Sequence, residues 1–430
     1  MNPLAEELNS ILDRTSAGRL LSDFGRRIYF PKGIIAQSAE AKKDAKTANA
    51  TIGMAYHNGK PMMLSALGEC INALKAEEIV SYAPTAGFEE ARTLWKEAIL
   101  AKNPSLQEKN ISLPVVVPGI TAGISYTADL FLGAGQTIIA NDPSWDNYSL
   151  IFETRRGASI RGVPFFAGDG LDLEAIRTAV REEAKSGAVR IILNFPNNPA
   201  GYSPSVEEAA ALCECLREAA ESGAAVLALC DDAYFGLRYE EGSFPESLFA
   251  VLSGLHERII AVKADGPTKE DYVWGLRVAF LTFGSKGLAA EDFAALIQKL
   301  EGAIRSSVSC SNTPAQFLLK KTSADPRSAG EKVRNYELLR ARYRAVKQFV
   351  AAHEDFMPLR SLPFNSGYFM SFACVGFDAE TLRRELLARH GIGVVALGGS
   401  YIRLAYSSLD EEQIAPVLET IFNTAAALGA

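Results

Sequence analysis

The chain has 430 residues, of which 48% are hydrophobic and 22% are charged, and this is the composition of an ordinary globular protein. Its 44 basic and 51 acidic side chains give a net charge of −7, so the chain as a whole does not attract nucleic acid or an anionic membrane. A site for an anionic ligand must therefore be a local cluster of basic groups. The length exceeds that of one small core and favours a large domain with a smaller one attached.

Cysteine and histidine usage excludes two further classes of protein. The six cysteines are scattered and most lie in apolar stretches, so they match neither a disulfide framework nor paired zinc ligands. The four histidines are isolated from one another, and we expect no metal site. Residues 1–14 carry acidic side chains early and lack a continuous apolar region, which differs from a signal peptide. Because no apolar run approaches membrane-spanning length, we expect a cytoplasmic protein.

Strand-like apolar runs begin after residue 114. They alternate with helical patterns up to residue 283, and several are nearly continuous in Val, Ile and Leu, as expected of strands covered on both faces. A helix is predicted at 205–222, because Ser205 and Glu208 have capping-box spacing and Gly223 follows its end. Seven strands with intervening helices predict a mainly parallel sheet with helices on both sides. The strand-like runs lie at 115–118, 137–141, 159–165, 189–195, 225–230, 258–263 and 277–283.

The pattern changes after residue 330. Apolar residues recur at three- and four-residue spacing from Tyr336 to Val350 and predict a long amphipathic helix. Strand-like runs follow at 367–372, 391–397 and 401–406, and we assign them to a smaller domain. The predicted organisation is an N-terminal segment that packs with the small domain (1–60), a large domain (61–325) and a C-terminal small domain (326–430).

Six short motifs occur in a fixed order along the chain. They are SYAPTAG at 81–87, PGITAGIS at 118–125, DPSWDNY at 142–148, NFPNNPAG at 194–201, DDAY at 231–234 and GPTKEDYVWGLR at 266–277. This series resembles the fold type I pyridoxal-phosphate enzymes, and within them the aspartate aminotransferase-like branch. The resemblance implies an α/β fold with a three-layer αβα large domain, whose seven-stranded sheet is mainly parallel, plus a smaller α+β domain from both termini. It also implies pyridoxal 5'-phosphate as the cofactor.

A cofactor of this kind needs an amine to hold its aldehyde. The resemblance implies that Lys269 supplies it and is also the base for the substrate's Cα proton. Lys263, at the end of a predicted strand, is the nearest rival. Only Lys269 has the family's eight-residue spacing to Arg277. We therefore predict Lys269 as the catalytic lysine.

The cofactor's ring needs further partners. Asp231 ends a predicted strand, and by resemblance it pairs with the pyridine nitrogen and keeps it protonated. Tyr234 is implied to donate to the phenolate oxygen, with Asn198 as its companion. Trp145 matches the aromatic residue that stacks on the ring, although a tryptophan in isolation is equally typical of a core.

The phosphate of the cofactor needs a cradle of donors. Gly119, Ile120 and Thr121 join a predicted strand to a helix, and backbone N–H groups at a helix start are a standard seat for phosphate. By resemblance, Arg277 adds a bidentate charge contact. Tyr82 matches the tyrosine that reaches the phosphate of a neighbouring subunit, which implies a homodimer with shared active sites.

The substrate is implied to bind through a second set of residues. Arg403 matches the family's carboxylate-binding arginine, and an arginine inside a half-buried strand is costly unless it is paired. Asn198 and Trp145 would contact the substrate from the cofactor side. The segment at 53–61 resembles the stretch that closes over substrate, with Met54 as the expected contact. Arg305 precedes a stretch that resembles S-N-P-P, where aspartate-specific relatives place an arginine for a second carboxylate; a helix-end cation is the alternative.

Two positions depart from the family's pattern. Gly266 stands where a phosphate-binding serine is usual, three residues before Lys269. Ala279 stands where a glycine commonly follows the arginine. One phosphate contact is therefore open, and Thr268 is the nearest residue that could replace it.

These implied roles predict an enzyme of amino acid metabolism that transfers an amino group between an α-amino acid and a 2-oxo acid. The predicted partners are these small molecules and a second copy of the chain. A lyase or decarboxylase on the same scaffold is the alternative, because fold does not settle function. A binding module that keeps the fold without catalysis is a third interpretation, which the intact lysine, aspartate and arginines disfavour.

Overall fold

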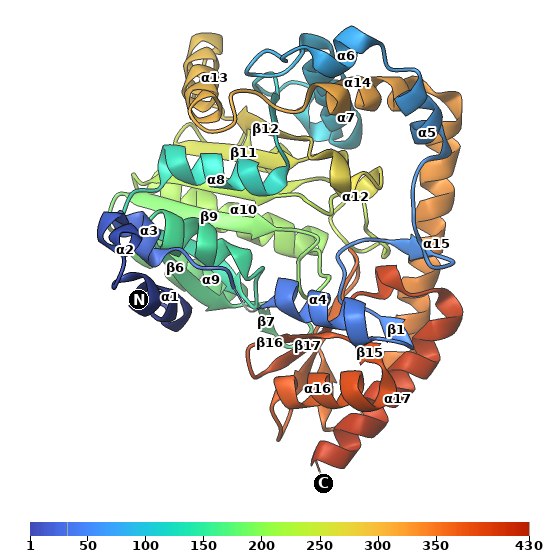
Figure 1. The fold of residues 1–430 in the computed structure, drawn as a ribbon. Helices are drawn as coiled ribbons and strands as arrows, with labels where there is room; N and C mark the ends of the chain where they lie inside the picture. Colours follow the sequence, from blue (N-terminus) through green and yellow to red (C-terminus); the bar gives the residue numbers. More distant parts are fainter. Residues whose placement is uncertain (32, 430) are drawn as a thin grey trace.

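The computed structural model describes residues 1–31 and 33–429. The larger domain is built on a seven-stranded sheet with the order β4-β12-β11-β10-β9-β5-β6 (Figure 1). Neighbouring strands are parallel except at β12, which runs antiparallel to both β11 and β4. The prediction of a seven-stranded, mainly parallel sheet is confirmed. The strands are β4 (Val115–Val117), β5 (Thr137–Asp142), β6 (Ser159–Pro164), β9 (Ala188–Asn194), β10 (Ala225–Asp231), β11 (Ile259–Asp265) and β12 (Ala279–Gly284).

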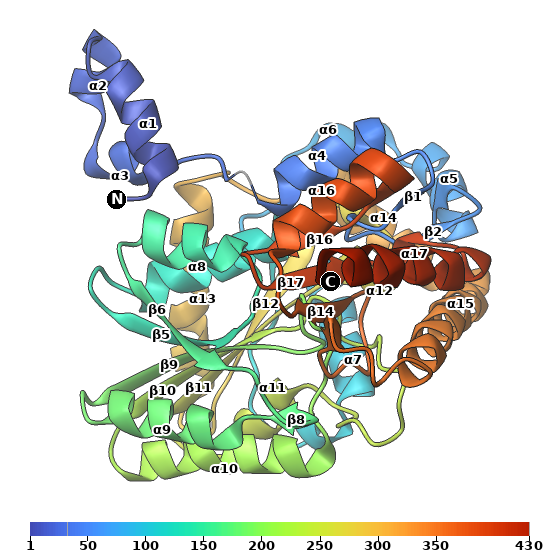
Figure 2. The same cartoon turned by 90° about the horizontal axis from the view of Figure 1, so that it is seen from below.

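Helices cover both faces of this sheet, as Figure 2 shows. Side chains of α8 and α13 form one buried apolar cluster with the strands, and those of α7, α9, α10 and α11 form another. The predicted helix at 205–222 is α10; its Glu208 N–H donates to the Ser205 hydroxyl at 3.2 Å. The helices are α7 (Glu89–Lys102), α8 (Ile120–Phe131), α9 (Leu173–Ala184), α10 (Val206–Glu221), α11 (Leu248–Leu252) and α13 (Ala290–Arg305).

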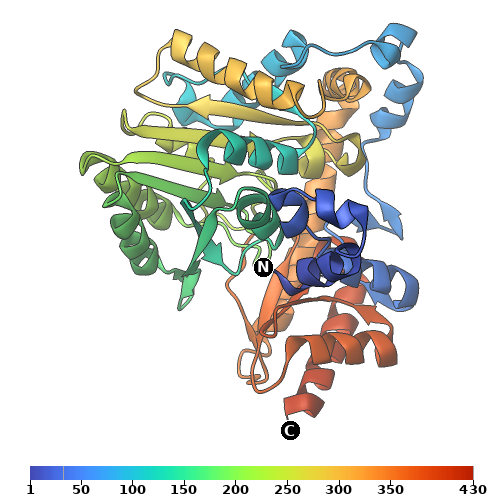
Figure 3. The ribbon, with the colours of Figure 1, turned by 60° about the vertical axis from the view of Figure 1, so that its left-hand side comes forward.

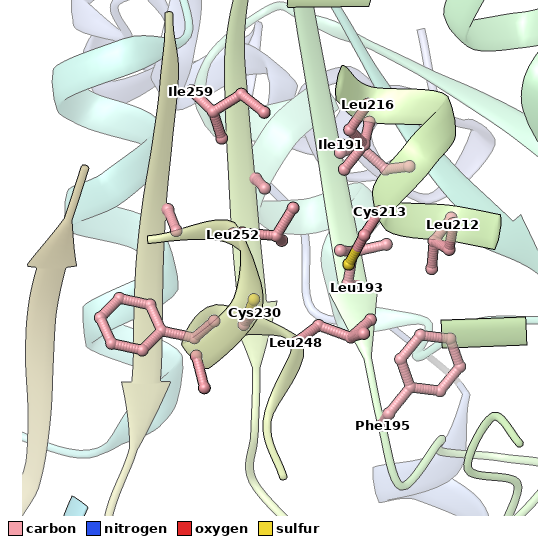
Figure 4. Close-up of a cluster of buried hydrophobic side chains, with 14 of the residues drawn as sticks. Ile191, Leu193, Phe195, Leu212, Cys213, Leu216, Cys230, Leu248, Leu252 and Ile259 are labelled. Atoms are coloured by element: carbon pink, nitrogen blue, oxygen red, sulfur yellow. The ribbon is translucent and has the colours of Figure 1, made fainter. Parts of the chain in front are cut away.

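Strand β9 illustrates how the sheet is buried on both sides. In Figure 4, Ile191 and Leu193 lie in the same apolar cluster as Leu212 and Leu216 of α10. Because successive side chains of a strand point to opposite faces, Ile192 belongs to the cluster on the other side. The polar residues that follow such strands come together at the carboxyl edge of the sheet.

The smaller domain contains a four-stranded antiparallel sheet with the order β13-β14-β17-β16. The long helix α15 runs along one side of the molecule in Figure 1, and in Figure 3 it descends, in orange, towards the red smaller domain. The run at 391–397, predicted as one strand, forms two, because β15 pairs with β1 whereas β16 pairs with β17. The elements are α15 (Pro326–Ala351), β13 (Leu359–Ser361), β14 (Met370–Cys374), α16 (Ala379–His390), β15 (Ile392–Gly393), β16 (Val395–Leu397), β17 (Tyr401–Leu404) and α17 (Glu411–Gly429).

The N-terminal segment divides between the two domains. Helix α4 (Ile34–Asp44) and strand β1 (Ala48–Asn49) contact the smaller domain. Helices α1 (Pro3–Leu12), α2 (Ser16–Leu20) and α3 (Asp23–Arg27) instead project from the body in Figure 2. Their link is to the larger domain, since the Arg27 side chain donates to the Thr154 carbonyl at 3.2 Å. The packing of residues 1–60 with the small domain stays a prediction.

The remaining short elements connect these parts. No helix within the described ranges is both long and apolar enough to cross a membrane. The boundaries predicted at 60/61 and 325/326 stay predictions, and the second falls where α15 begins. The short elements are β2 (Tyr56–His57), β3 (Lys60–Pro61), α5 (Ser65–Asn72), α6 (Ala76–Val80), η2 (Ser149–Arg155), β7 (Phe166–Ala167), β8 (Gly170–Leu171), α12 (Pro267–Glu270) and α14 (Thr313–Ala324).

Candidate functional site

A cavity of about 220 Å³ lies at the carboxyl edge of the large sheet, where the smaller domain meets it. Strands β9 and β10, the start of α8 and the loop that carries α12 supply one wall, and β17 of the smaller domain supplies the opposite one. The carboxyl edge of a parallel sheet is the usual place for ligands in α/β proteins. The lining residues are Ile34, Gly53, Ile120, Thr121, Trp145, Asn194, Asn198, Asp231, Ala233, Tyr234, Thr268, Lys269, Arg277, Phe369 and Arg403.

Lys269 reaches this cavity from the single-turn helix α12. Its Nζ lies 5.1 Å from the centre of the Tyr234 ring. Burial lowers the pKa of Lys269 to about 8, and Arg277 contributes in the same direction, while Asp231 opposes. The main chain is fixed as well, because the Tyr368 hydroxyl donates to the Lys269 carbonyl at 2.9 Å. The structure thus provides a half-buried lysine whose amine has an unusually large neutral fraction.

The rival lysine, Lys263, lies elsewhere. It is fully buried in β11, forms an ion pair with Asp232, and lies 3.3 Å from the Asp265 carboxylate. Both acids stabilise its charge and raise its pKa, although burial alone would lower it. Lys263 does not line the cavity, so the preference for Lys269 agrees with the geometry.

Asp231 faces the cavity, whereas the next residue, Asp232, faces the opposite side of the sheet and pairs with Lys263. Burial raises the pKa of the Asp231 carboxyl to about 6. The Tyr148 hydroxyl donates to Asp231 Oδ2 at 2.5 Å and, together with Lys269, moderates that rise. The carboxylate is therefore mostly ionised at neutral pH and is held by one hydroxyl donor.

Arg277 lies against the start of α8. Its backbone is left-handed, with φ 51° and ψ 49°, and its Nη1 donates to the Trp274 carbonyl at 3.0 Å. Gly119 precedes α8 with φ 96°, and a Cβ at that position would lie 2.1 Å from Arg277 Nη2. Only glycine lets the guanidinium lie beside the helix N-terminus, where Ile120 and Thr121 line the cavity. The result is a compact positive seat for an anion.

The two departures from the family pattern are in contact. A Cβ at Gly266 would lie 2.8 Å from Ala279 Cα and 3.0 Å from Ala279 Cβ. The positions are neighbours because Asp265 pairs with Phe280 across β11 and β12. The methyl group of Ala279 occupies part of the space that a side chain at 266 would need, although the nearest atom is the Ala279 Cα, which a glycine would keep. The missing serine and the missing glycine are therefore coupled by packing, and we refer to the pair as the reciprocal exchange.

Arg403 forms the opposite end of the cavity and is 2% exposed. Its Nη1 donates to Asn198 Oδ1 at 3.0 Å, its Nη2 donates to the Thr51 carbonyl at 2.9 Å, and its guanidinium lies 4.2 Å from the Phe369 ring centre. Its buried Nε has no partner among the described residues. Burial lowers the pKa of Arg403 to about 10, so the group stays charged at neutral pH. A buried cation with a free donor is suited to a carboxylate ligand.

Other predicted contacts differ from expectation in this single chain. Met54 does not line the cavity: its carbonyl accepts from the Ser407 hydroxyl at 3.2 Å, and Gly53 lines the cavity instead. Tyr82 is 88% exposed and lies outside the cavity, as a residue meant for a neighbouring subunit would. Arg305 is the exposed last residue of α13 and donates to the Ser309 hydroxyl, so it also lies outside.

Several lining residues were not predicted from the sequence. Asn194 ends β9, donates from Nδ2 to the Asp231 carbonyl at 2.8 Å, and accepts from the Asn198 N–H at 2.8 Å. The sequence did contain an indication of this role, because Asn194 begins the motif NFPNNPAG that also contains Asn198. Ile34 and Phe369 carry no such signal, because apolar residues in a helix or strand ordinarily belong to a core.

Comparison with known proteins decides the family. The family model for class I and II aminotransferases matches residues 53–421. The chain belongs to this family. Aminotransferases of class I and II use pyridoxal phosphate.

Relatives within the family are distant. The chain is 23% identical over 240 residues to a probable N-acetyl-LL-diaminopimelate aminotransferase of Bacillus subtilis, covering 56% of this chain and 54% of that protein. It is 24% identical over 260 residues to a cytoplasmic aspartate aminotransferase of Oryza sativa, covering 58% and 61%. A solved aminotransferase from Anaerococcus prevotii superposes with a TM-score of 0.82 at 22% identity, over 93% of this chain and 98% of that one. The alignments with the two curated relatives thus span only a little more than half of each, and the solved structure shows the shared fold.

Proposed function

We propose that this chain is a pyridoxal-phosphate-dependent aminotransferase that moves an amino group between an α-amino acid and a 2-oxo acid. The observation that carries the proposal is one cavity that holds a lysine of lowered pKa, a buried carboxylate and a buried arginine with a free Nε. Family membership supports it, and the two curated relatives carry the names of aminotransferases. No observation favours the lyase or decarboxylase alternatives.

The described residues fit pyridoxal phosphate. The Arg277 guanidinium, which Gly119 allows to lie beside the N-terminus of the twelve-residue helix α8, suits its phosphate. Asp231 would hold the ring nitrogen, Tyr234 and Asn198 the phenolate oxygen, and Lys269 the aldehyde carbon. When bound, the cofactor supplies an aldehyde that takes up the amino group and a ring that accepts electrons from the substrate's Cα.

Lys269 is suited to move the proton at the substrate's Cα. With a pKa of about 8, roughly a tenth of its Nζ is neutral at pH 7, about 300 times more than for an unperturbed lysine. Its neutral Nζ accepts the Cα proton and returns it on the way to the product. Asp231, with a pKa of about 6, stays ionised while Lys269 works.

Arg403 and Asn198 are suited to orient the substrate. The guanidinium is fixed by the Asn198 amide oxygen, the Thr51 carbonyl and the Phe369 ring, so its free Nε has little freedom. An α-carboxylate bound there leaves the Cα–H bond as the one directed at Lys269. Orientation of this kind favours proton removal over loss of the carboxylate, which distinguishes transamination from decarboxylation.

A panel of amino acids tests the proposal. The protein loaded with pyridoxal phosphate is mixed with each amino acid, with and without 2-oxoglutarate, and the absorbance of the cofactor is followed. Turnover that depends on the oxo acid is expected. Ammonia with pyruvate, or carbon dioxide, would instead show a lyase or a decarboxylase, and no spectral change with any amine would show a binding module.

We also propose a homodimer in which Tyr82 reaches the phosphate seat of the partner chain. The exposure of Tyr82 and of its apolar neighbour Val80, which is 78% exposed, supports an interface at this surface. A Tyr82→Phe chain mixed with a Lys269→Ala chain should regain part of the activity, since one site of each mixed dimer is intact. If activity is not regained although the subunits demonstrably exchange, the shared site is disproved.

A cytoplasmic location is a further proposal. All six cysteines are free in the structure, which suits a reducing compartment. Cell fractionation of the tagged protein should recover it with cytosolic markers.

A further inference from the structure

The proposed function gives a role to each cation that lines the cavity. Three basic side chains line it, namely Lys269, Arg277 and Arg403, for the amino group, the phosphate and the α-carboxylate. Among the described residues of the lining there is no further lysine or arginine. A carboxylate at the end of a substrate side chain would therefore find no further cation, beyond these three, among the described residues of this cavity.

A second cavity, of about 620 Å³, adjoins the first, and Ile34 lines both. Its described lining contains Asp142, Asp146 and Glu380 but no lysine or arginine. The described lining of this outer cavity is therefore acidic, and the cavity is separated from the inner one by Ile34, which both share.

The three acids of the outer cavity are not equivalent. Glu380 is neutralised by Arg383 and Arg384, whose Nε atoms lie 2.6 Å and 2.7 Å from its carboxylate. Asp142 and Asp146 are exposed residues, and neither forms an ion pair with a lysine or arginine among the described residues. Burial raises the pKa of the Asp146 carboxyl, whereas the Ile34 N–H and Arg403 act to lower it. These two carboxylates carry the negative charge of the outer cavity.

Asp146 stands between the two cavities. It follows Trp145, which lines the inner one, and its Oδ2 would be 2.8 Å from a Cβ added at Gly33, so its carboxylate lies against the start of α4. It is also near enough to Arg403 to counter, in part, the lowering of that arginine's pKa by burial. A ligand that binds Arg403 therefore lies within the electrostatic reach of Asp146.

We infer that the site selects amino acids whose side chain ends in a positive charge over those that end in a carboxylate, and that Asp146 is the specificity-determining residue. The inference rests on the proposed function, because the α-carboxylate must first bind Arg403, whose buried and unpaired Nε fixes that end of the ligand. A side chain that extends past Ile34 then meets Asp146. A cationic end is attracted there, and an acidic end is repelled, because the described residues of the lining hold no compensating cation.

Three amino acids of similar length test the inference. L-Ornithine, L-norvaline and L-glutamate end in an ammonium, a methyl and a carboxylate group, respectively. Each is reacted with the cofactor-loaded protein in a single half-reaction followed by absorbance, at low salt. We expect kcat/KM for ornithine to exceed that for glutamate by about tenfold, the size of a partly screened charge interaction. Faster reaction with glutamate than with ornithine overturns the inference and leaves the proposed function standing. No reaction with any of the three also overturns the inference, and the full panel of amino acids then decides whether the proposed function falls with it.

Replacing Asp146 identifies the residue responsible. Asp146→Asn keeps an oxygen beside α4 and removes the charge, so the ornithine-to-glutamate ratio should fall at least threefold. Asp355→Asn, an exposed acid on the smaller domain, is the matched control and should leave the ratio unchanged. A ratio that does not change in Asp146→Asn overturns the assignment.

The binding of carboxylates that cannot react gives an independent measurement of the same preference. Pentanoate and glutarate differ in a terminal methyl or carboxylate group, and calorimetry with the loaded protein gives their dissociation constants. Pentanoate should bind more tightly than glutarate, and Asp146→Asn should narrow the difference. Tighter binding of glutarate to the unmodified protein would show a cation at the side-chain end and refute the inference.

Discussion

Replacing Gly266 with serine should destabilise the protein unless Ala279 is changed with it. A Cβ at position 266 would lie 2.8 Å from Ala279 Cα, 3.0 Å from Ala279 Cβ and 3.2 Å from the Val278 carbonyl oxygen. The backbone at Gly266 is extended, with φ 165°, so a side chain there causes no conformational strain. The cost of the substitution is therefore a packing cost between β11 and β12.

The magnitude follows from the close contacts. Insertion of atoms into a packed core costs about 1–3 kcal/mol, and we expect Gly266→Ser to fall in this range. Ala279→Gly alone should cost about 1 kcal/mol, because it removes a buried methyl group and adds a flexible residue to a strand. In the double variant, the contact of the serine Cβ with the methyl group is relieved, while the backbone contacts with the Cα of residue 279 and the Val278 carbonyl oxygen remain. The two changes together should thus cost less than their sum by more than about 0.5 kcal/mol.

Urea denaturation of the four proteins measures this coupling. Gly302→Ser is the control for introducing the same side chain, because a Cβ at Gly302 in α13 meets open space. The double variant also places a hydroxyl near the proposed phosphate seat, so it should bind pyridoxal phosphate about fivefold more tightly than Ala279→Gly, the effect of one hydrogen bond. Additive costs, within about 0.5 kcal/mol, would refute the reciprocal exchange.

Four further outcomes are expected. Borohydride reduction of the loaded protein followed by peptide mapping should place the cofactor on Lys269; a label on Lys263 would contradict the assignment. In the cofactor-free protein, the rate at which an amine-directed reagent modifies Lys269 should rise with pH to a midpoint near pH 8, because the lowered pKa leaves the amine neutral above that pH. A midpoint near that of ordinary lysines would contradict the effect of burial. Tyr148→Phe removes the donor to Asp231 and should raise the pKa of that carboxyl above about 6. The pH below which the loaded protein loses its cofactor should therefore move upward. An unchanged pH profile of cofactor loss would show that the hydrogen bond is unimportant. Arg305→Ala should change the rates with glutamate and norvaline equally, whereas a loss of about 1.5–3 kcal/mol for glutamate alone would show that Arg305 binds a side-chain carboxylate.

Much of the candidate site could be predicted because its residues follow the ends of strands. Asp231 ends β10 and Asn198 follows β9, and the carboxyl ends of parallel strands meet at one edge whatever the helices do. The spacing from Lys269 to Arg277 spans a single loop between β11 and β12, so local sequence was sufficient there. Chain order and strand direction together bring these residues into one cavity.

The residues that were missed depend on packing between distant segments. Ile34 reaches the cavity because α4 lies against the smaller domain, and Phe369 reaches it through its stacking on Arg403. Neither contact follows from local pattern, since an apolar side chain is equally suited to any core. Met54 was expected in place of Gly53 because the motif marks the segment but not which of two adjacent residues points inward.

The opposite orientation of Asp231 and Asp232 makes strand alignment part of the chemistry. Lys263 is the cross-strand neighbour of Cys230, and it meets Asp232 only because β10 and β11 are paired in this alignment. A slip of β10 by one residue would move every side chain of that strand to the other face of the sheet. It would bury Asp231 behind the sheet and present Asp232 to the cavity without the Tyr148 donor. The ion pair behind the sheet therefore favours folded molecules in which the correct acid faces the cavity.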